Sequence, residues 1–155
     1  AQDIGTVLKS EAYCGYPDEN VATLTNDKAT LAAIRRALAK LASDAQSDDT
    51  VIVFFSGHGT RITTGSEPSS ALVPYDFKSS DVAGTTLGDA ELTRALLNIK
   101  ATRLAVVIDA CHAADAATLK SEAAQPSFAG FDVKSLSALA SGTGRVMYAS
   151  SRAEE

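Results

Sequence analysis

Two nearly continuous apolar runs constrain the fold of this chain more than any other feature. They are Thr50–Ser56 (TVIVFFS) and Arg103–Ala110 (RLAVVIDA), which are rich in Val and Ile. Strands that are apolar at successive positions are buried on both faces, as in a parallel sheet that helices cover. The sequence therefore predicts an α/β sandwich, a mostly parallel sheet with helices on both faces.

Weaker strand patterns occupy Asn20–Thr25 (NVATLT) and Arg145–Ser150 (RVMYAS). Helices are predicted where apolar residues recur at intervals of about three or four. These residues are Ile4, Val7 and Leu8; Leu31, Ile34, Leu38 and Leu41; Leu92, Leu96 and Ile99; and Leu136 and Leu139. Thr30 is the expected N-cap of the second helix, Asp89 starts the third, and Gly142 ends the fourth.

Two segments are predicted to be loops, Arg61–Ser80 and Ala113–Asp132, because Gly, Pro, Ser and other small residues dominate them. Each follows a buried strand, so both are expected to leave the carboxyl-terminal edge of the sheet. Open α/β sheets bind ligands at that edge.

The bulk properties exclude several classes of protein. A chain of 155 residues corresponds to one domain, and the net charge of −5 with scattered basic residues argues against a nucleic-acid partner. No apolar run approaches the roughly 20 residues of a membrane helix, so no membrane partner is expected. Cys14 and Cys111 form neither a CxxC pair nor a disulfide framework, which indicates a reducing, cytoplasmic location.

The sequences SGHG (residues 56–59) and DACH (residues 109–112) stand at the ends of the two buried strands. Parallel neighbouring strands would bring His58 and Cys111 together, and an imidazole beside a thiol takes its proton and activates it as a nucleophile. The Gly59 and Cys111 amides would then hold the oxyanion of a tetrahedral intermediate. The pair predicts nucleophilic catalysis.

Simpler interpretations exist for each residue taken alone. His58 would be an ordinary strand-end histidine, Cys111 a small buried apolar side chain, and Cys14 a bystander in a turn. A zinc site from His58, Cys111, His112 and Asp109 is disfavoured because adjacent Cys and His rarely bind one ion, and we predict no metal. Catalysis is favoured because both residues stand at strand tips.

The paired motifs resemble the caspase clan of cysteine peptidases, in its metacaspase and orthocaspase branch. The histidine and the cysteine are 111 − 58 = 53 positions apart, and DACHA stands where animal caspases have QACRG. Further similar stretches are Gly15–Pro17, Leu72–Asp76 and Ala149–Arg152. The resemblance implies a cysteine endopeptidase with a Cys111–His58 dyad, a caspase-like fold, and a p20-like catalytic domain over residues 1–155.

The resemblance also implies that a first strand would precede Ala1 and that a p10-like part would follow Arg152. The expected partners are therefore that p10-like segment of the same protein and protein or peptide substrates. Asp109, with Ser56, matches the metacaspase S1 pocket, which implies cleavage after Arg or Lys; a turn-capping role for Asp109 is the alternative.

Two further expectations concern regulation. Many metacaspases need calcium, but Glu67 is the only acid between Arg61 and Tyr75, so we expect no calcium requirement and no cofactor. Lys120 stands in the exposed loop after Cys111, where an enzyme with a basic preference would cut itself before Ser121. Lys120 as a simple solubilising charge is the alternative.

Other functions stay open at this point. One is a CHAT-type or separase-like peptidase that a partner activates. Another is a catalytically silent caspase homologue that acts as a scaffold, although such homologues typically lose the Cys or His that this chain keeps. A flavodoxin-like binding module is the third, without a Gly-rich phosphate loop to support it.

Overall fold

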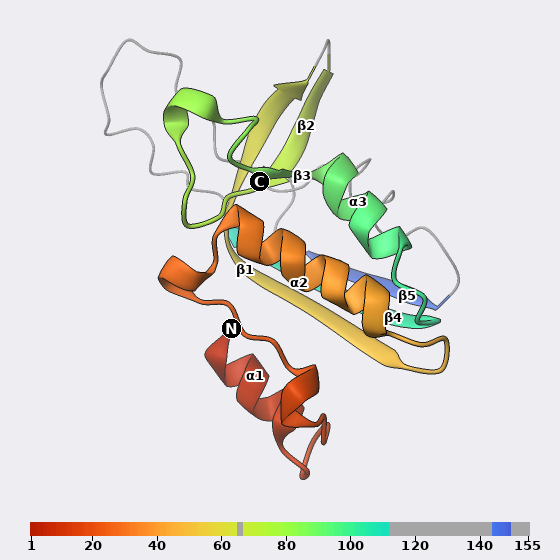
Figure 1. Ribbon diagram of the computed structural model, residues 1–155. Helices are drawn as coiled ribbons and strands as arrows, with labels where there is room; N and C mark the ends of the chain where they lie inside the picture. Colours follow the sequence, from red (N-terminus) through yellow and green to blue (C-terminus); the bar gives the residue numbers. More distant parts are fainter. Residues whose placement is uncertain (65–66, 112–143, 150–155) are drawn as a thin grey trace.

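A five-stranded sheet forms the centre of the structure, a computed structural model that describes residues 1–64, 67–111 and 144–149 (Figure 1). Its strand order is β3-β2-β1-β4-β5. β1 runs parallel to β4, and β4 runs parallel to β5, whereas β2 is antiparallel to both β1 and β3. The strands are β1 (Thr50–Thr64), β2 (Glu67–Leu72), β3 (Leu87–Gly88), β4 (Arg103–Cys111) and β5 (Arg145–Ala149).

The two apolar runs lie side by side at the centre of this sheet, as predicted. β1 and β4 pair in parallel register from Thr50 opposite Arg103 to His58 opposite Cys111. Successive side chains of a strand point to opposite faces, so Val51 and Leu104 share one face, and both are buried there. The α/β class and the mostly parallel sheet are confirmed.

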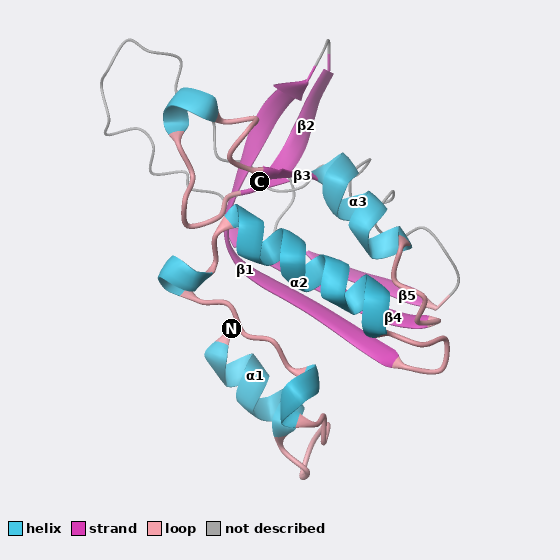
Figure 2. Ribbon diagram, in the orientation of Figure 1, coloured by secondary structure: helices cyan, strands magenta, loops and turns pink. Residues whose placement is uncertain are grey.

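Helices α2 (Leu31–Asp44) and α3 (Asp89–Leu97) lie across the same face of the sheet (Figures 1 and 2). Thr30 caps α2 as predicted, because its Oγ1 accepts the N–H of Ala33 at 3.2 Å. One apolar core joins the two helices to β1 and β4. Its buried members include Leu31, Leu38, Leu92, Leu96, Leu104, Val106 and Ile108.

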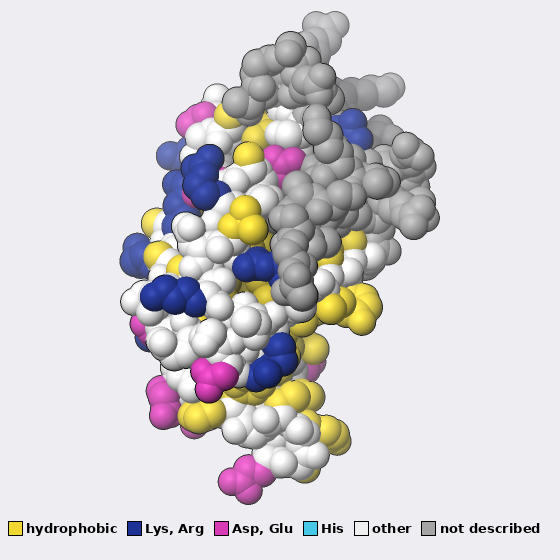
Figure 3. Space-filling view, turned by 90° about the vertical axis from the view of Figure 1, so that its right-hand side faces the viewer, with side chains coloured by type: hydrophobic (Ala, Val, Ile, Leu, Met, Phe, Trp, Pro, Cys, Tyr) yellow, Lys and Arg dark blue, Asp and Glu magenta, His cyan; other side chains and the backbone are white. Residues whose placement is uncertain are grey.

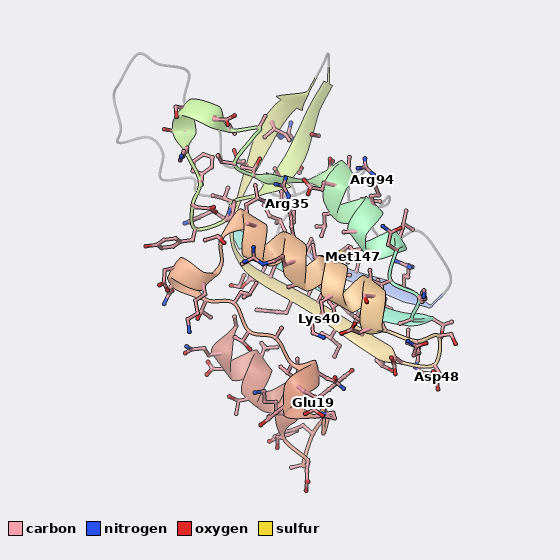
Figure 4. The ribbon with its side chains drawn as sticks, in the orientation of Figure 1. Glu19, Arg35, Lys40, Asp48, Arg94 and Met147 are labelled. Atoms are coloured by element: carbon pink, nitrogen blue, oxygen red, sulfur yellow. The ribbon has the colours of Figure 1, made fainter. Side chains whose placement is uncertain are left out.

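Two arginines connect α3 to its neighbours, α2 and β5. Arg35 reaches from α2 toward α3 (Figure 4), where its guanidinium donates to both carboxylate oxygens of Glu91 at 2.6 and 2.9 Å. Arg145, the first residue of β5, donates to the carbonyl oxygens of Leu96 at 2.9 Å and Ile99 at 3.3 Å. These contacts attach β5 to the last turn of α3 and to the segment that follows it.

The strand predicted at Asn20–Thr25 is wrong. Asp18–Asn20 form a short 3-10 helix, a second one follows at Asn26–Lys28, and the residues between them belong to no ladder. Val21 and Thr25 do have extended backbone angles. An extended segment becomes a strand only when its backbone groups pair with a neighbour, and no described strand pairs with this one.

The loop predicted at Arg61–Ser80 is also wrong over its first half. β1 continues to Thr64 and pairs with β2 from Gly59 opposite Leu72 to Thr64 opposite Glu67. Thr60 and Ser70 are buried within this hairpin, so its small polar side chains belong to the sheet. A 3-10 helix at Ser79–Asp81 follows before β3. Thr is common in strands, so a segment rich in Thr and Ser can form a strand as well as a loop.

Other predictions have mixed outcomes. The N-terminal helix is confirmed as α1 (Gln2–Lys9), which lies below β1 in Figure 1. The helix around Leu136 and Leu139 and the loop at Ala113–Asp132 fall outside the described residues. Within the described part of the chain, no helix is long and apolar enough to cross a membrane. On the face in Figure 3, basic side chains stand apart among polar, acidic and apolar ones.

Candidate active site

β1 changes its pairing partner at the candidate histidine. Its first part, through His58, forms the parallel ladder with β4, and its second part, from Gly59, forms the antiparallel ladder with β2. The backbone carbonyl of His58 also accepts the N–H of Val73, just beyond β2, at 2.9 Å. The backbone of His58 is therefore held between β4 on one side and the end of β2 on the other.

His58 and Cys111 are direct partners in the parallel register. Neighbouring strands lie about 4.8 Å apart, so the two residues stand side by side at the carboxyl-terminal end of the parallel β1–β4 ladder. His58 is exposed there. The structure thus brings together the two residues that the sequence predicted to form the dyad.

Ser56 and Asp109 are also partners in this register, two residues before His58 and Cys111. The hydroxyl of Ser56 donates to Oδ2 of Asp109 at 3.2 Å. Ser56 is exposed and Asp109 is partly buried. Because side chains alternate along a strand, positions 56, 58, 109 and 111 belong to one face, opposite the face that α2 and α3 cover.

Gly59, the predicted oxyanion residue, is buried one position after the last β1–β4 pair. Its backbone therefore lies next to that of Cys111, the other amide of the prediction. Lys120 and His112 lie outside the described residues.

The segment after β2 contains a residue to which the sequence analysis gave no role. Asp76 Oδ1 accepts the backbone N–H of Leu31, the first residue of α2, at 2.8 Å, and the N–H of Tyr75 donates to the Ala29 carbonyl at 3.0 Å. Leu72–Asp76 was noted only for its resemblance. The sequence offered one indication, the acidic residue Asp76 three positions after Val73. Its partner Leu31 lies 45 positions away in sequence, so local spacing did not reveal the contact.

No group of three or more His, Cys, Asp or Glu side chains is close enough to hold a metal ion within the described ranges. Asp89, the acid at the start of α3, accepts the adjacent N–H of Ala90 at 2.6 Å. Glu91 is paired with Arg35. The other described cysteine, Cys14, is exposed and free.

This geometry defines a class of protein: an α/β domain that places a histidine and a cysteine side by side at the end of a parallel ladder, as caspase-like cysteine peptidases do. The family model described as "Metacaspase, peptidase C14 domain" matches residues 6–120, a span that includes both His58 and Cys111. The chain belongs to the metacaspase family of peptidase C14.

Curated relatives carry the same name. Metacaspase-1A of Aspergillus terreus is 36% identical over 118 residues, which cover 68% of this chain and 28% of that protein. Metacaspase-1 of Eremothecium gossypii is 35% identical over 118 residues, with 68% of this chain and 25% of that protein covered. The chain thus spans about a quarter of the length of these relatives.

A solved structure supports the fold alone. The crystal structure of a protein from Geobacter sulfurreducens matches with a TM-score of 0.57 and 23% sequence identity, and the match covers 72% of this chain and 39% of that one. The chain therefore shares its α/β architecture with an experimentally determined structure.

Proposed function

We propose that this chain is the catalytic part of a cysteine endopeptidase that cleaves after Arg or Lys with a Cys111–His58 dyad. The observation that carries the proposal is the parallel pairing of His58 with Cys111 at the end of the β1–β4 ladder. Membership of the metacaspase family supports the peptidase activity. The proposed substrates are proteins or peptides.

The chemistry follows from the two side chains. His58 takes the proton of the Cys111 thiol, and the thiolate attacks the scissile carbonyl carbon to form a tetrahedral intermediate. The amides of Gly59 and Cys111 hold the oxyanion. The intermediate collapses to a thioester as the leaving amine takes a proton from His58, and water then hydrolyses the thioester.

The specificity is assigned to Asp109. Asp109 stands two residues before Cys111, on the same face of the sheet as the dyad, and Ser56 donates a hydrogen bond to its carboxylate. A partly buried carboxylate favours a cation in its neighbourhood, and the Arg or Lys side chain of a substrate supplies one. This arrangement supports an S1 pocket for basic residues.

The remaining assignments concern the surroundings of the enzyme. A p10-like segment of the same protein is the proposed intramolecular partner. The exposed, free Cys14 supports a reducing, cytoplasmic location. No calcium requirement is proposed, because the segment after His58 has too few acids for an ion that prefers six to eight oxygens.

The dyad is tested with the full-length protein that carries this chain. Cys111→Ala and His58→Ala are each expected to abolish cleavage of an Arg-containing fluorogenic peptide while the protein stays folded. Cys14→Ala is the control and should keep full activity. Retained turnover in Cys111→Ala would refute the assignment, because no other described cysteine lies near His58.

A further inference from the structure

We infer that Asp76 is a positioning residue for His58, an inference that rests on the proposed function of the dyad. Asp76 belongs neither to the proposed dyad nor to the proposed S1 pocket, which Asp109 and Ser56 form. Its carboxylate binds the start of α2, and the segment that it ends is hydrogen-bonded to the carbonyl of His58.

The first anchor of this segment is α2 itself. Leu31, whose N–H donates to Asp76 Oδ1 at 2.8 Å, has only 6% of its surface exposed and belongs to the apolar core. Moving Leu31 would disturb that core, so Leu31 is a fixed point. A hydrogen bond from a helix N-terminal amide to a carboxylate is charge-assisted and is stronger than one between neutral groups.

The second anchor is the histidine. Val73, three residues before Asp76, donates its N–H to the His58 carbonyl at 2.9 Å. Between these two ends, Pro74 is buried and Tyr75 donates to the Ala29 carbonyl at 3.0 Å. Residues 73–76 therefore form a short tie between the α2 N-terminus and the backbone of His58.

This tie matters because it holds the backbone of His58 through the carbonyl. The imidazole projects from that backbone, so a shift of the backbone moves the ring. A displacement of about 1 Å in a catalytic group lowers turnover by up to about 100-fold. Losing the Asp76 anchor leaves only the Tyr75–Ala29 hydrogen bond at that end of the tie, so Val73 holds the His58 carbonyl less firmly and His58 can shift relative to Cys111.

The chain offers a matched control for this inference. Thr30 caps the same helix, through Oγ1 and the N–H of Ala33 at 3.2 Å, but it does not belong to the tie. Asp76→Ala and Thr30→Ala each remove one acceptor from the first turn of α2, so both should lower the stability of the protein by a similar amount. Asp76→Asn keeps an oxygen in the position of Oδ1 and loses only the charge.

The experiment measures kcat and KM of these variants in the full-length protein. Asp76→Ala should lower kcat by about 10-fold to 100-fold with KM nearly unchanged. Thr30→Ala should leave kcat within about two-fold, and Asp76→Asn should restore most of it. Equal kcat values in Asp76→Ala and Thr30→Ala at equal stability would overturn the inference, since Asp76 would then be only a helix cap.

A second measurement separates this inference from the proposed activity. The imidazole NMR signals of His58 should shift in Asp76→Ala and stay in place in Thr30→Ala, whether or not the protein cleaves peptides. Unchanged His58 signals in Asp76→Ala would overturn the positioning role. Turnover in Cys111→Ala would instead overturn the dyad.

If Asp76→Ala does not fold, Asp76→Glu serves the same purpose. Glutamate reaches the Leu31 N–H only if residues 73–76 move by the length of the additional methylene. The variant should therefore fold, keep the cap and still lose kcat. Full kcat in a folded Asp76→Glu protein would show that the position of the tie has no effect on His58.

Discussion

Ser56 donates a hydrogen bond to Asp109 across the β1–β4 ladder, with 3.2 Å between Oγ and Oδ2. The two residues are register partners, and the next partners of the same face are His58 and Cys111. The groups proposed for recognition and those proposed for chemistry therefore occupy neighbouring positions on one face of the same ladder, with the pair Gly57 and Ala110 between them. A substrate bound by the first pair would extend toward the second.

The first prediction concerns specificity. Asp109→Asn should lower kcat/KM for Arg and Lys substrates by about 30-fold or more, because losing one partner of a desolvated charge pair costs at least about 2 kcal/mol. Ser56→Ala removes only one hydrogen bond and should cost about five-fold. A peptide library scanned at P1 gives both values. Preference of the wild type for Asp at P1 would contradict the assignment of this pocket.

The second prediction concerns calcium. Activity after treatment with a chelator should stay within about two-fold of the untreated enzyme, because Glu67 is the only acid between Arg61 and Tyr75 and calcium prefers six to eight oxygens. Peptidase assays in EDTA, with and without added calcium, test this. Loss of activity in EDTA that calcium restores would place the ligands elsewhere in the full-length protein.

The third prediction concerns self-cleavage, which follows from the proposed basic specificity. The purified wild-type protein should accumulate a fragment that begins at Ser121, and Cys111→Ala should not. Lys120→Gln should suppress the fragment without removing activity on a peptide substrate. Mass spectrometry of the fully active enzyme decides the matter: an intact bond between Lys120 and Ser121 would show that Lys120 is an ordinary surface charge.

The fourth prediction concerns pH and Tyr16, whose hydroxyl donates to the carbonyl of Thr50 at 2.8 Å. Burial, and then the acidic groups of Cys14 and Asp49, raise the pKa of Tyr16 above its usual value of about 10. The neutral hydroxyl is thus favoured in the folded protein. Its stabilisation is complete below about pH 10 and is lost as the pH rises through the folded pKa.

Tyr16→Phe should therefore lower the free energy of unfolding by about 1 kcal/mol at pH 8 and reduce its fall above pH 10. Urea unfolding at several pH values measures both effects. Tyr13→Phe is the control, since 75% of Tyr13 is exposed. If the wild type and Tyr16→Phe lose stability in parallel above pH 10, Tyr16 does not cause the alkaline decline.

The fifth prediction concerns Gly144, immediately before β5. Its φ is +75°, and a Cβ at this position would collide with the backbone carbonyl of Thr102. Gly144→Ala should destabilise the protein by about 3 kcal/mol or more. Gly15→Ala is the matched control because Gly15 has a φ of +64° with its nearest neighbour 3.9 Å away, so it should cost only about 1 to 2 kcal/mol. If thermal denaturation shows that Gly144→Ala and Gly15→Ala lose the same stability, the collision with the Thr102 carbonyl does not contribute to the destabilisation.

Local patterns predicted the centre of the fold well. The continuous apolar runs identified β1 and β4, because a strand that is buried on both faces needs apolar residues at successive positions. Thr30 identified the start of α2, because a capping side chain bonds an amide only three residues away. The resemblance to metacaspases implied that Ser56 and Asp109 line one pocket, and the structure contains a hydrogen bond between them.

Features that depend on a distant partner were not predictable. Val21–Thr25 has a strand-like sequence, yet a strand exists only where another strand pairs with it. The Thr residues at the end of β1 and the Ser residues of β2 were predicted as a loop, because the pairing between β1 and β2 cannot be inferred from their local sequence. The contact between Asp76 and Leu31 joins residues 45 positions apart, and no spacing rule reports it.

The attachment of β5 has a consequence for a molecule cut at Lys120. β5 is joined to β4 by a parallel ladder from Leu104 opposite Arg145 to Ile108 opposite Ala149, and Met147 packs against the core (Figure 4). Arg145 also holds the carbonyls of Leu96 and Ile99. None of these contacts requires an intact peptide bond after Lys120. The cut enzyme should therefore migrate as two polypeptides on a denaturing gel and as one particle in gel filtration, a single catalytic unit assembled from two chains.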